Sequence, residues 1–132
     1  MRTRSKARQR AVEALFEAEQ RKVEVSEVLA RNPETNEFAT QLCQLVTDHQ
    51  NRIDEIIATY LTDRTIERMP ALDRAITRIA VAELLYARET DTAVIVSEAV
   101  DLAEMLSTEQ SSKFLNGLIG AVARVRENIS TL

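Results

Sequence analysis

The residues best suited to chemistry stand at the start of the chain, where basic side chains alternate with small and polar ones. Arg2, Arg4, Lys6, Arg8 and Arg10 carry five positive charges, and no acidic residue lies among them. Guanidinium and ammonium groups are strong donors to phosphate and carboxylate oxygens, so this run is typical of a surface that binds a polyanion. We call residues 2–10 the basic segment. The alternative is a solvated basic tail without a ligand.

The rest of the chain has the opposite charge. Residues 1–22 hold seven basic and three acidic residues, whereas residues 23–132 hold ten basic and eighteen acidic residues. The formal net charge of −4 therefore hides a polarised molecule with one basic end. This asymmetry favours an anionic partner that docks at the basic segment.

Residues suited to catalysis or metal binding are single rather than clustered. His49, the only histidine, falls on an apolar stripe without a second ligand at suitable spacing, so we interpret it as a residue at the edge of the core. Cys43, the only cysteine, has apolar neighbours, which favours a buried side chain over a reactive thiol. Glu83 falls near the apolar side of a helical pattern, where a structural bond to another helix is favoured over acid–base work. We expect no catalytic residue, no metal site and no cofactor.

Composition predicts an all-α protein. The 132 residues suit one domain, and they include only two glycines and two prolines. No Asn-Gly or Asp-Gly hairpin signal and no glycine-rich phosphate loop occurs in the sequence. A single cysteine fits a reducing compartment, and no apolar run reaches the roughly 18 residues of a membrane span. We therefore expect a soluble cytoplasmic protein.

Apolar residues recur at helical spacing in six segments. The expected helices cover residues 5–21, 26–31, 38–61, 70–86 and 92–106, and a last helix follows the cap-rich residues 107–112. Residues 94–96 are β-branched and score as strand by propensity, but the longer periodicity around them favours a helix. Pro70 fits the first position of its helix. Gly117 and Gly120 predict a close approach between helices, because glycine is costly inside a helix without such a use.

The basic segment continues into the first helix. Arg4 and Arg8 lie on the same meridian as the apolar residues Val12 and Leu15. Since two arginines are not buried without partners, we expect the first two turns to protrude past the helical bundle or to lie at its rim.

Four blocks of sequence, in this order, resemble the NusB family of bacterial transcription antitermination proteins. They are residues 8–16, 72–84, 96–103 and 113–118, and the last, Lys-Phe-Leu-Asn-Gly-Leu, is the most specific. The resemblance spans nearly the whole chain. It implies an all-helical fold of about six to seven helices in two small packed bundles, with an N-terminal half at about 1–62 and a C-terminal half at about 66–132. It implies no catalysis.

The same resemblance implies a function in RNA binding. Members pair with the ribosomal protein NusE, bind the single-stranded boxA element of nascent ribosomal RNA, and act on the transcription elongation complex. The implied RNA-binding positions are Arg4, Lys6, Arg8, Arg10, Gln110, Lys113 and Phe114. The implied partner-binding positions are Phe16, Glu67 and Asp73.

Several alternatives stay open at the level of sequence. Phe114 could stack on a splayed base if its ring is exposed, or it could be an ordinary core residue. Asp73 could face the partner, or it could only favour the start of its own helix. The competing class of function is a protein-interaction module of the same fold that never meets RNA. Whether the chain is a monomer or a homodimer also stays open.

Overall fold

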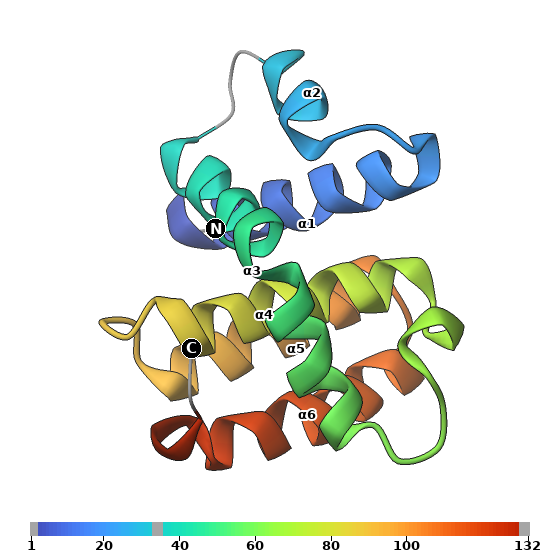
Figure 1. Cartoon of the computed structure of the whole chain (residues 1–132), viewed down its shortest axis with the longest axis vertical. Helices are drawn as coiled ribbons and strands as arrows, with labels where there is room; N and C mark the ends of the chain where they lie inside the picture. The colour runs from blue at the N-terminus through green and yellow to red at the C-terminus, as the bar shows by residue number, and fades with distance from the viewer. Residues whose placement is uncertain (1–2, 33–35, 130–132) are drawn as a thin grey trace.

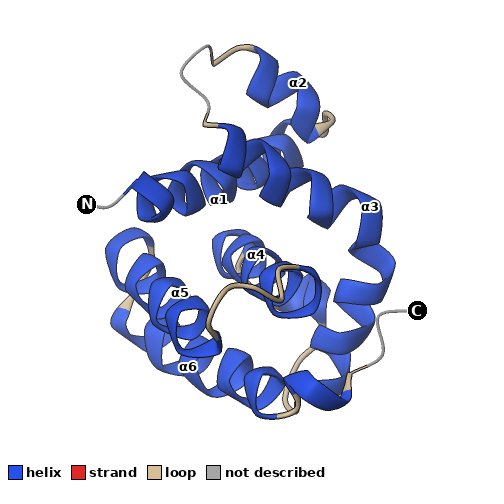
Figure 2. Ribbon diagram, turned by 90° about the vertical axis from the view of Figure 1, so that its left-hand side faces the viewer, coloured by secondary structure: helices blue, strands red, loops and turns tan. Residues whose placement is uncertain are grey.

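The computed structural model describes residues 3–32 and 36–129, and in this part of the chain every regular element is helical (Figures 1 and 2). Arg2 and Pro33 lie outside the described residues. The elements, in order, are α1 (Thr3–Arg21), α2 (Val25–Ala30), α3 (Glu37–Tyr60), the 3₁₀ turn η1 (Ile66–Arg68), α4 (Ala71–Tyr86), α5 (Thr92–Leu106), α6 (Glu109–Arg124) and the 3₁₀ turn η2 (Arg126–Asn128). The all-α prediction is confirmed, including the helix over residues 92–106. None of the described helices is long and apolar enough to cross a membrane.

The central element is α4. It contacts α1, α3, α5 and α6, and Figure 2 shows it nearly end-on with these helices around it. Eleven of its sixteen residues are buried, including the acidic residues Asp73 and Glu83. A buried carboxylate is stable only when other groups donate hydrogen bonds to it or pair with its charge. The partners of these two residues therefore fix where the neighbouring helices lie.

The predicted third helix is present but is not straight. At His49 the backbone leaves the helical conformation, with φ −125° and ψ 20°, so α3 is kinked there. The His49 ring stacks on the ring of Tyr86 in α4, with 3.9 Å between centroids. This is the structural role at the edge of the core that the sequence predicted. Since α3 contacts α1 as well as α4 and α6, it joins helices of both predicted halves. The division into halves at about residues 62–66 stays a prediction.

Polar side chains cap two of the helices. The Asn36 side chain accepts a hydrogen bond from the Phe38 amide at 2.6 Å at the start of α3, and Thr108 accepts one from the Ser111 amide at 3.0 Å at the start of α6. Each cap satisfies a backbone donor that a helix leaves unpaired in its first turn. Pro70 lies just before α4 rather than at its first position.

The prediction about the glycines is wrong. Among the described residues, a methyl group at Gly117 would meet nothing within 4 Å, and one at Gly120 would meet only the end of the Arg124 side chain, at 3.8 Å. Neither glycine therefore lies against another of the described helices. Periodicity places both residues on α6, but it does not determine how close the facing helix comes.

Candidate functional site

The first turns of α1 present cations to solvent. Arg4 and Lys6 are exposed, and Arg10 is partly exposed. The guanidinium carbon of Arg4 lies over the ring of Phe38 in α3, 4.4 Å from the ring centroid. A guanidinium on an aromatic face is held by the negative charge of the π cloud. We call Arg4, Lys6 and Arg10 the amino-terminal group.

Arg8 is the exception in the basic segment, because only 3% of its surface is exposed. Its Nε and Nη2 atoms donate to the two carboxylate oxygens of Glu83 in α4, at 2.7 and 2.9 Å. Its Nη1 atom donates to Glu98 in α5 at 3.2 Å. The expectation that Arg4 and Arg8 protrude past the bundle or lie at its rim is therefore wrong for Arg8, whose side chain is buried. Two acids on neighbouring helices supply the partners that allow the guanidinium to be buried.

The electrostatics of this cluster favour the charged form of Arg8. Burial by itself lowers the pKa of Arg8, but the hydrogen bonds and charges of Glu83 and Glu98 outweigh it, and the pKa is raised. Ser5, one turn earlier, donates its hydroxyl to the same Glu98 carboxylate. The start of α1 is thus bonded to α4 and α5. These bonds hold in place the helical turns that carry Arg4 and Lys6. Glu83 has the structural role that its position in the sequence indicated.

A second set of candidate residues lies at the start of α6. Gln110 and Lys113 are exposed, and Phe114 is partly buried. Lys113 lies 3.7 Å from Glu109 in an exposed ion pair. The ring of Phe114 is covered by Arg64, whose guanidinium carbon is 4.4 Å from the ring centroid. Phe114 is therefore neither a bare stacking surface nor a fully buried core residue. We call Gln110, Lys113 and Phe114 the α6 group.

Asp73 is buried, with 2% of its surface exposed, so the expectation that it lies on a partner-facing surface is wrong. Its carboxylate accepts hydrogen bonds from the hydroxyls of Ser107 at 3.1 Å and Ser111 at 2.8 Å. These residues belong to the end of α5 and the start of α6. Asp73 therefore bonds the first turn of α4 to the point where α6 begins, and it supports the α6 group from inside the protein.

The other two partner-binding candidates are accessible. Phe16 and Glu67 are exposed, on α1 and on η1. Phe16 borders a groove of about 640 Å³ between α1 and α2. The groove is also lined by Arg10, Glu13, Glu17, Val28 and Leu29. An exposed aromatic ring beside apolar and charged side chains is a common feature of protein interfaces.

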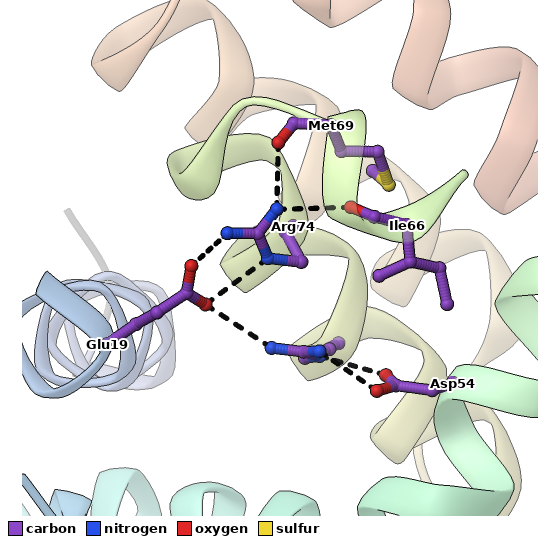
Figure 3. A network of polar contacts seen from close by, with 6 residues as sticks. Glu19, Asp54, Ile66, Met69 and Arg74 are labelled. Atoms are coloured by element: carbon purple, nitrogen blue, oxygen red, sulfur yellow. Dashed lines mark hydrogen bonds and ion pairs between the residues drawn. The ribbon is translucent and has the colours of Figure 1, made fainter. Parts of the chain in front are cut away.

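A polar network joins the end of α1 to η1, α4 and α3 (Figure 3). Glu19, at the end of α1, is paired with Arg74 in α4. Arg74 also donates to the carbonyl oxygens of Met69 at 2.8 Å and Ile66 at 3.1 Å, which fixes η1 against α4. Arg78, one turn further along α4, pairs with Asp54 in α3 at 2.9 Å. The elements that carry Phe16 and Glu67 are therefore connected through α4.

The candidate RNA-binding residues do not come together in one place. Arg8 meets α4 at Glu83, whereas the start of α6 meets it at Asp73, ten residues earlier. At a rise of 1.5 Å per residue these two points are about 15 Å apart along the helix. Figure 1 shows the first turns of α1 and the first turn of α6 at opposite ends of α4. The amino-terminal group and the α6 group are therefore two separate surfaces.

Three residues of these surfaces were not predicted from the sequence. Glu98 and Phe38 belong to predicted helices, and an arginine on the apolar stripe of α1 is a signal that an acid on another helix pairs with it. Arg64 lies in the link between α3 and α4, where no periodicity marks a residue as significant. Only the folded chain places it beside Phe114.

Cys43, the residue with the most reactive type of side chain, has a role in packing. Cys43 is fully buried, and this burial raises the pKa of its thiol to about 12. The thiol is therefore protonated at neutral pH, as its interpretation as a core residue requires. Among the described residues no group of three or more histidine, cysteine or acidic side chains is arranged to hold a metal ion.

Comparisons with known proteins agree on one family. The model of the NusB family matches residues 5–124 of this chain. The transcription antitermination protein NusB of Kineococcus radiotolerans is 44% identical over 135 aligned positions, which cover 98% of this chain and 99% of that protein. The same protein of Thermobifida fusca is 46% identical and covers 97% of this chain and 94% of its own length.

Solved structures have the same fold. NusB of T. maritima superposes with a TM-score of 0.84 at 26% identity, over 98% of this chain and 100% of that chain. A structure of the antitermination factors NusB and NusE in complex with double-stranded RNA superposes with a TM-score of 0.82 at 27% identity. That match covers 95% of this chain and 98% of the solved chain.

Proposed function

Because this chain belongs to the NusB family, we propose that it is a transcription antitermination factor that pairs with NusE and binds boxA-type single-stranded RNA of nascent ribosomal transcripts. It acts on the transcription elongation complex through this RNA. The relatives that carry the NusB name support the role, and a solved complex of NusB and NusE with double-stranded RNA supports NusE and RNA as partners. The chain's own residues must then supply an RNA surface and a protein surface.

The observation that carries the proposal is the anchored cationic turn at the start of α1. Arg4 and Lys6 are exposed in an otherwise acidic protein, and the buried pair between Arg8 and Glu83 fixes the helix that carries them. Cations held on a rigid element contact phosphates at a smaller entropic cost than cations on a flexible tail. Arg8 therefore acts as a positioning residue, and Arg4, Lys6 and Arg10 are the residues that meet RNA.

The α6 group adds a second contact at the other end of α4. Lys113 supplies a further cation, Gln110 supplies an amide that can pair with a base edge, and Phe114 supplies an aromatic ring. Single-stranded RNA is bound by this combination of cations that follow the backbone and planar groups that stack on bases. A net-acidic protein with so few cations binds RNA weakly alone, so a partner that extends the surface fits this arrangement.

The proposed protein surface includes Phe16 and Glu67. Both are exposed, and the network of Glu19 and Arg74 fixes the elements that carry them. Asp73 contributes only indirectly, by holding the start of α6. The groove beside Phe16 also favours a second candidate function, a protein-interaction module that does not need RNA. Binding measurements distinguish the two.

The test is a titration of the full chain into a labelled boxA-type single strand, with and without NusE, and with an unlabelled duplex of the same sequence as competitor. We expect weak binding by the chain alone, tighter binding with NusE, and poor competition by the duplex. If NusE binds the chain but RNA does not bind either the chain or the pair, the protein-interaction module is the correct function.

A further inference from the structure

In the described part of the chain, guanidinium groups lie over two phenyl rings, one at each candidate RNA surface. Arg4 lies over Phe38 and Arg64 over Phe114, each with its guanidinium carbon 4.4 Å from the ring centroid. The buried Arg8 also lies over Phe38, with its guanidinium carbon 5.4 Å from the ring centroid. Both rings are partly buried, whereas Arg64 is exposed. The sequence pointed to Phe114 as the stacking residue, but Arg64 lies over its ring and is the more accessible of the two.

Such a pair presents a planar cation to an incoming strand. A guanidinium is flat, delocalised and weakly hydrated, and unpaired RNA bases stack on guanidinium planes as well as on aromatic rings. The ring below holds the plane in position through the cation–π attraction. We propose that Arg64, held on Phe114, is the surface on which a base of single-stranded RNA stacks at the α6 group. This inference rests on the proposed RNA-binding function.

The ion pairs around this surface can exchange for RNA phosphates. Arg64 donates to the carboxylate of its neighbour Asp63 at 3.3 Å, and this hydrogen bond lowers the pKa of Asp63. Lys113 is paired with Glu109, and all four side chains are substantially exposed. Exposed pairs are weak and are screened by salt, so each cation can turn to a phosphate without leaving a buried charge behind. Arg8, with its two buried bonds, does not have this freedom.

The experiment separates the plane of Arg64 from its charge. Arg64→Ala removes both, and Arg64→Lys keeps the charge but removes the plane. Arg124→Ala is the matched control, because Arg124 is also an exposed arginine and lies at the end of α6, away from Phe114 at its start. Each full-length variant is mixed with NusE and titrated with a boxA-type single strand. The strand is then replaced by a set in which one base at a time is removed to leave an abasic sugar.

We expect one abasic position to weaken binding to wild type by at least about five-fold, the lower end of the effect of losing a stacked base. The same position should make little difference to Arg64→Ala and Arg64→Lys, because the surface it stacks on is gone. It should keep its full effect in Arg124→Ala. Such coupling between one base and one side chain is the signature of a direct contact.

Three outcomes would overturn the inference. The first is wild-type affinity in Arg64→Ala. The second is a set of abasic penalties that is the same in all variants. The third is full retention of the coupling in Arg64→Lys, which would show that charge alone suffices. If wild type binds RNA and the Arg64 variants bind it in the same way, the proposed function stands without this contact. If wild type with NusE does not bind RNA, both fall. Melting curves confirm that the exposed substitutions leave the fold intact.

Discussion

At the scale of single residues, the burial of Arg8 departs most from what the sequence predicts. Its guanidinium is satisfied by Glu83 and Glu98, which lie 75 and 90 positions away in the chain. Removal of one partner from a buried ion pair leaves an uncompensated charge and costs about 3–5 kcal/mol, whereas apolar replacement of both can be nearly neutral. This asymmetry makes the role of the pair measurable.

We predict that Arg8→Met lowers the free energy of unfolding by about 3–5 kcal/mol and that Arg8→Met combined with Glu83→Leu recovers much of the loss. Urea denaturation of the two single variants and the double variant measures this directly. Glu98 keeps contact with solvent, so it does not become a second stranded charge. A double variant no more stable than the worse single variant would show that the pair is not the reason for the burial of Arg8.

The thiol of Cys43 gives a second prediction for one residue. Because burial raises its pKa to about 12, native protein should react very slowly with Ellman's reagent at about pH 8.5, the ordinary pKa of a free thiol, and unfolded protein should react fully. The unfolded state releases its thiol proton first, so this group stabilises the fold below about pH 8.5. The contribution is lost as the pH rises toward the folded value. Fast labelling under native conditions would contradict the burial of Cys43.

At the scale of elements, Asp73 connects α4 to the start of α6. We predict that Asp73→Ala costs about 1–3 kcal/mol of stability, because the hydroxyls of Ser107 and Ser111 lose their buried acceptor. Denaturation measures this cost, and a titration with NusE under conditions where the variant is folded tests association. We expect NusE affinity close to wild type. A large loss of affinity with unchanged stability would restore Asp73 to the partner surface.

Replacement of a glycine in α6 is expected to increase stability, in contrast to replacement of Asp73. Because a methyl group at Gly117 would meet no atom within 4 Å, we predict that Gly117→Ala raises the free energy of unfolding by about 0.5–1 kcal/mol. The gain comes from the lower backbone entropy of the unfolded chain. Thermal and urea denaturation check it. A destabilised variant would mean that another helix approaches Gly117 more closely than the structure shows.

The helices themselves could be predicted from the sequence, because an apolar stripe at 3.6-residue spacing depends only on local order. The residues that were misplaced depend on tertiary packing. The stripe puts Arg8 on the inward face, but the identity of its partners is decided by how α4 and α5 lie against α1. The partners of Asp73 likewise depend on how α5 and α6 lie against α4. No local sequence pattern distinguishes Arg64. The kink at His49 was also invisible to periodicity.

At the scale of the whole molecule, α4 connects the amino-terminal group to the α6 group. The amino-terminal group is bonded to it through Arg8 and Glu83, and the α6 group through Asp73 and Ser111. The two points of attachment, Glu83 and Asp73, are ten residues or about 15 Å apart along α4, so a single strand that touches both groups must span at least this distance over the surface.

The salt dependence of RNA binding tests most directly whether the exposed cations of α1 contact phosphates. The double variant Arg4→Ala with Lys6→Ala is compared with Arg21→Ala with Lys22→Ala, which removes two exposed cations from the other end of α1. Loss of two phosphate contacts on a single strand should reduce the logarithmic salt slope by about 1.4. We expect this reduction, with weaker binding, only in the Arg4 and Lys6 variant. Equal affinities and equal slopes in the two double variants, with melting temperatures like wild type, would contradict an RNA surface at the start of α1.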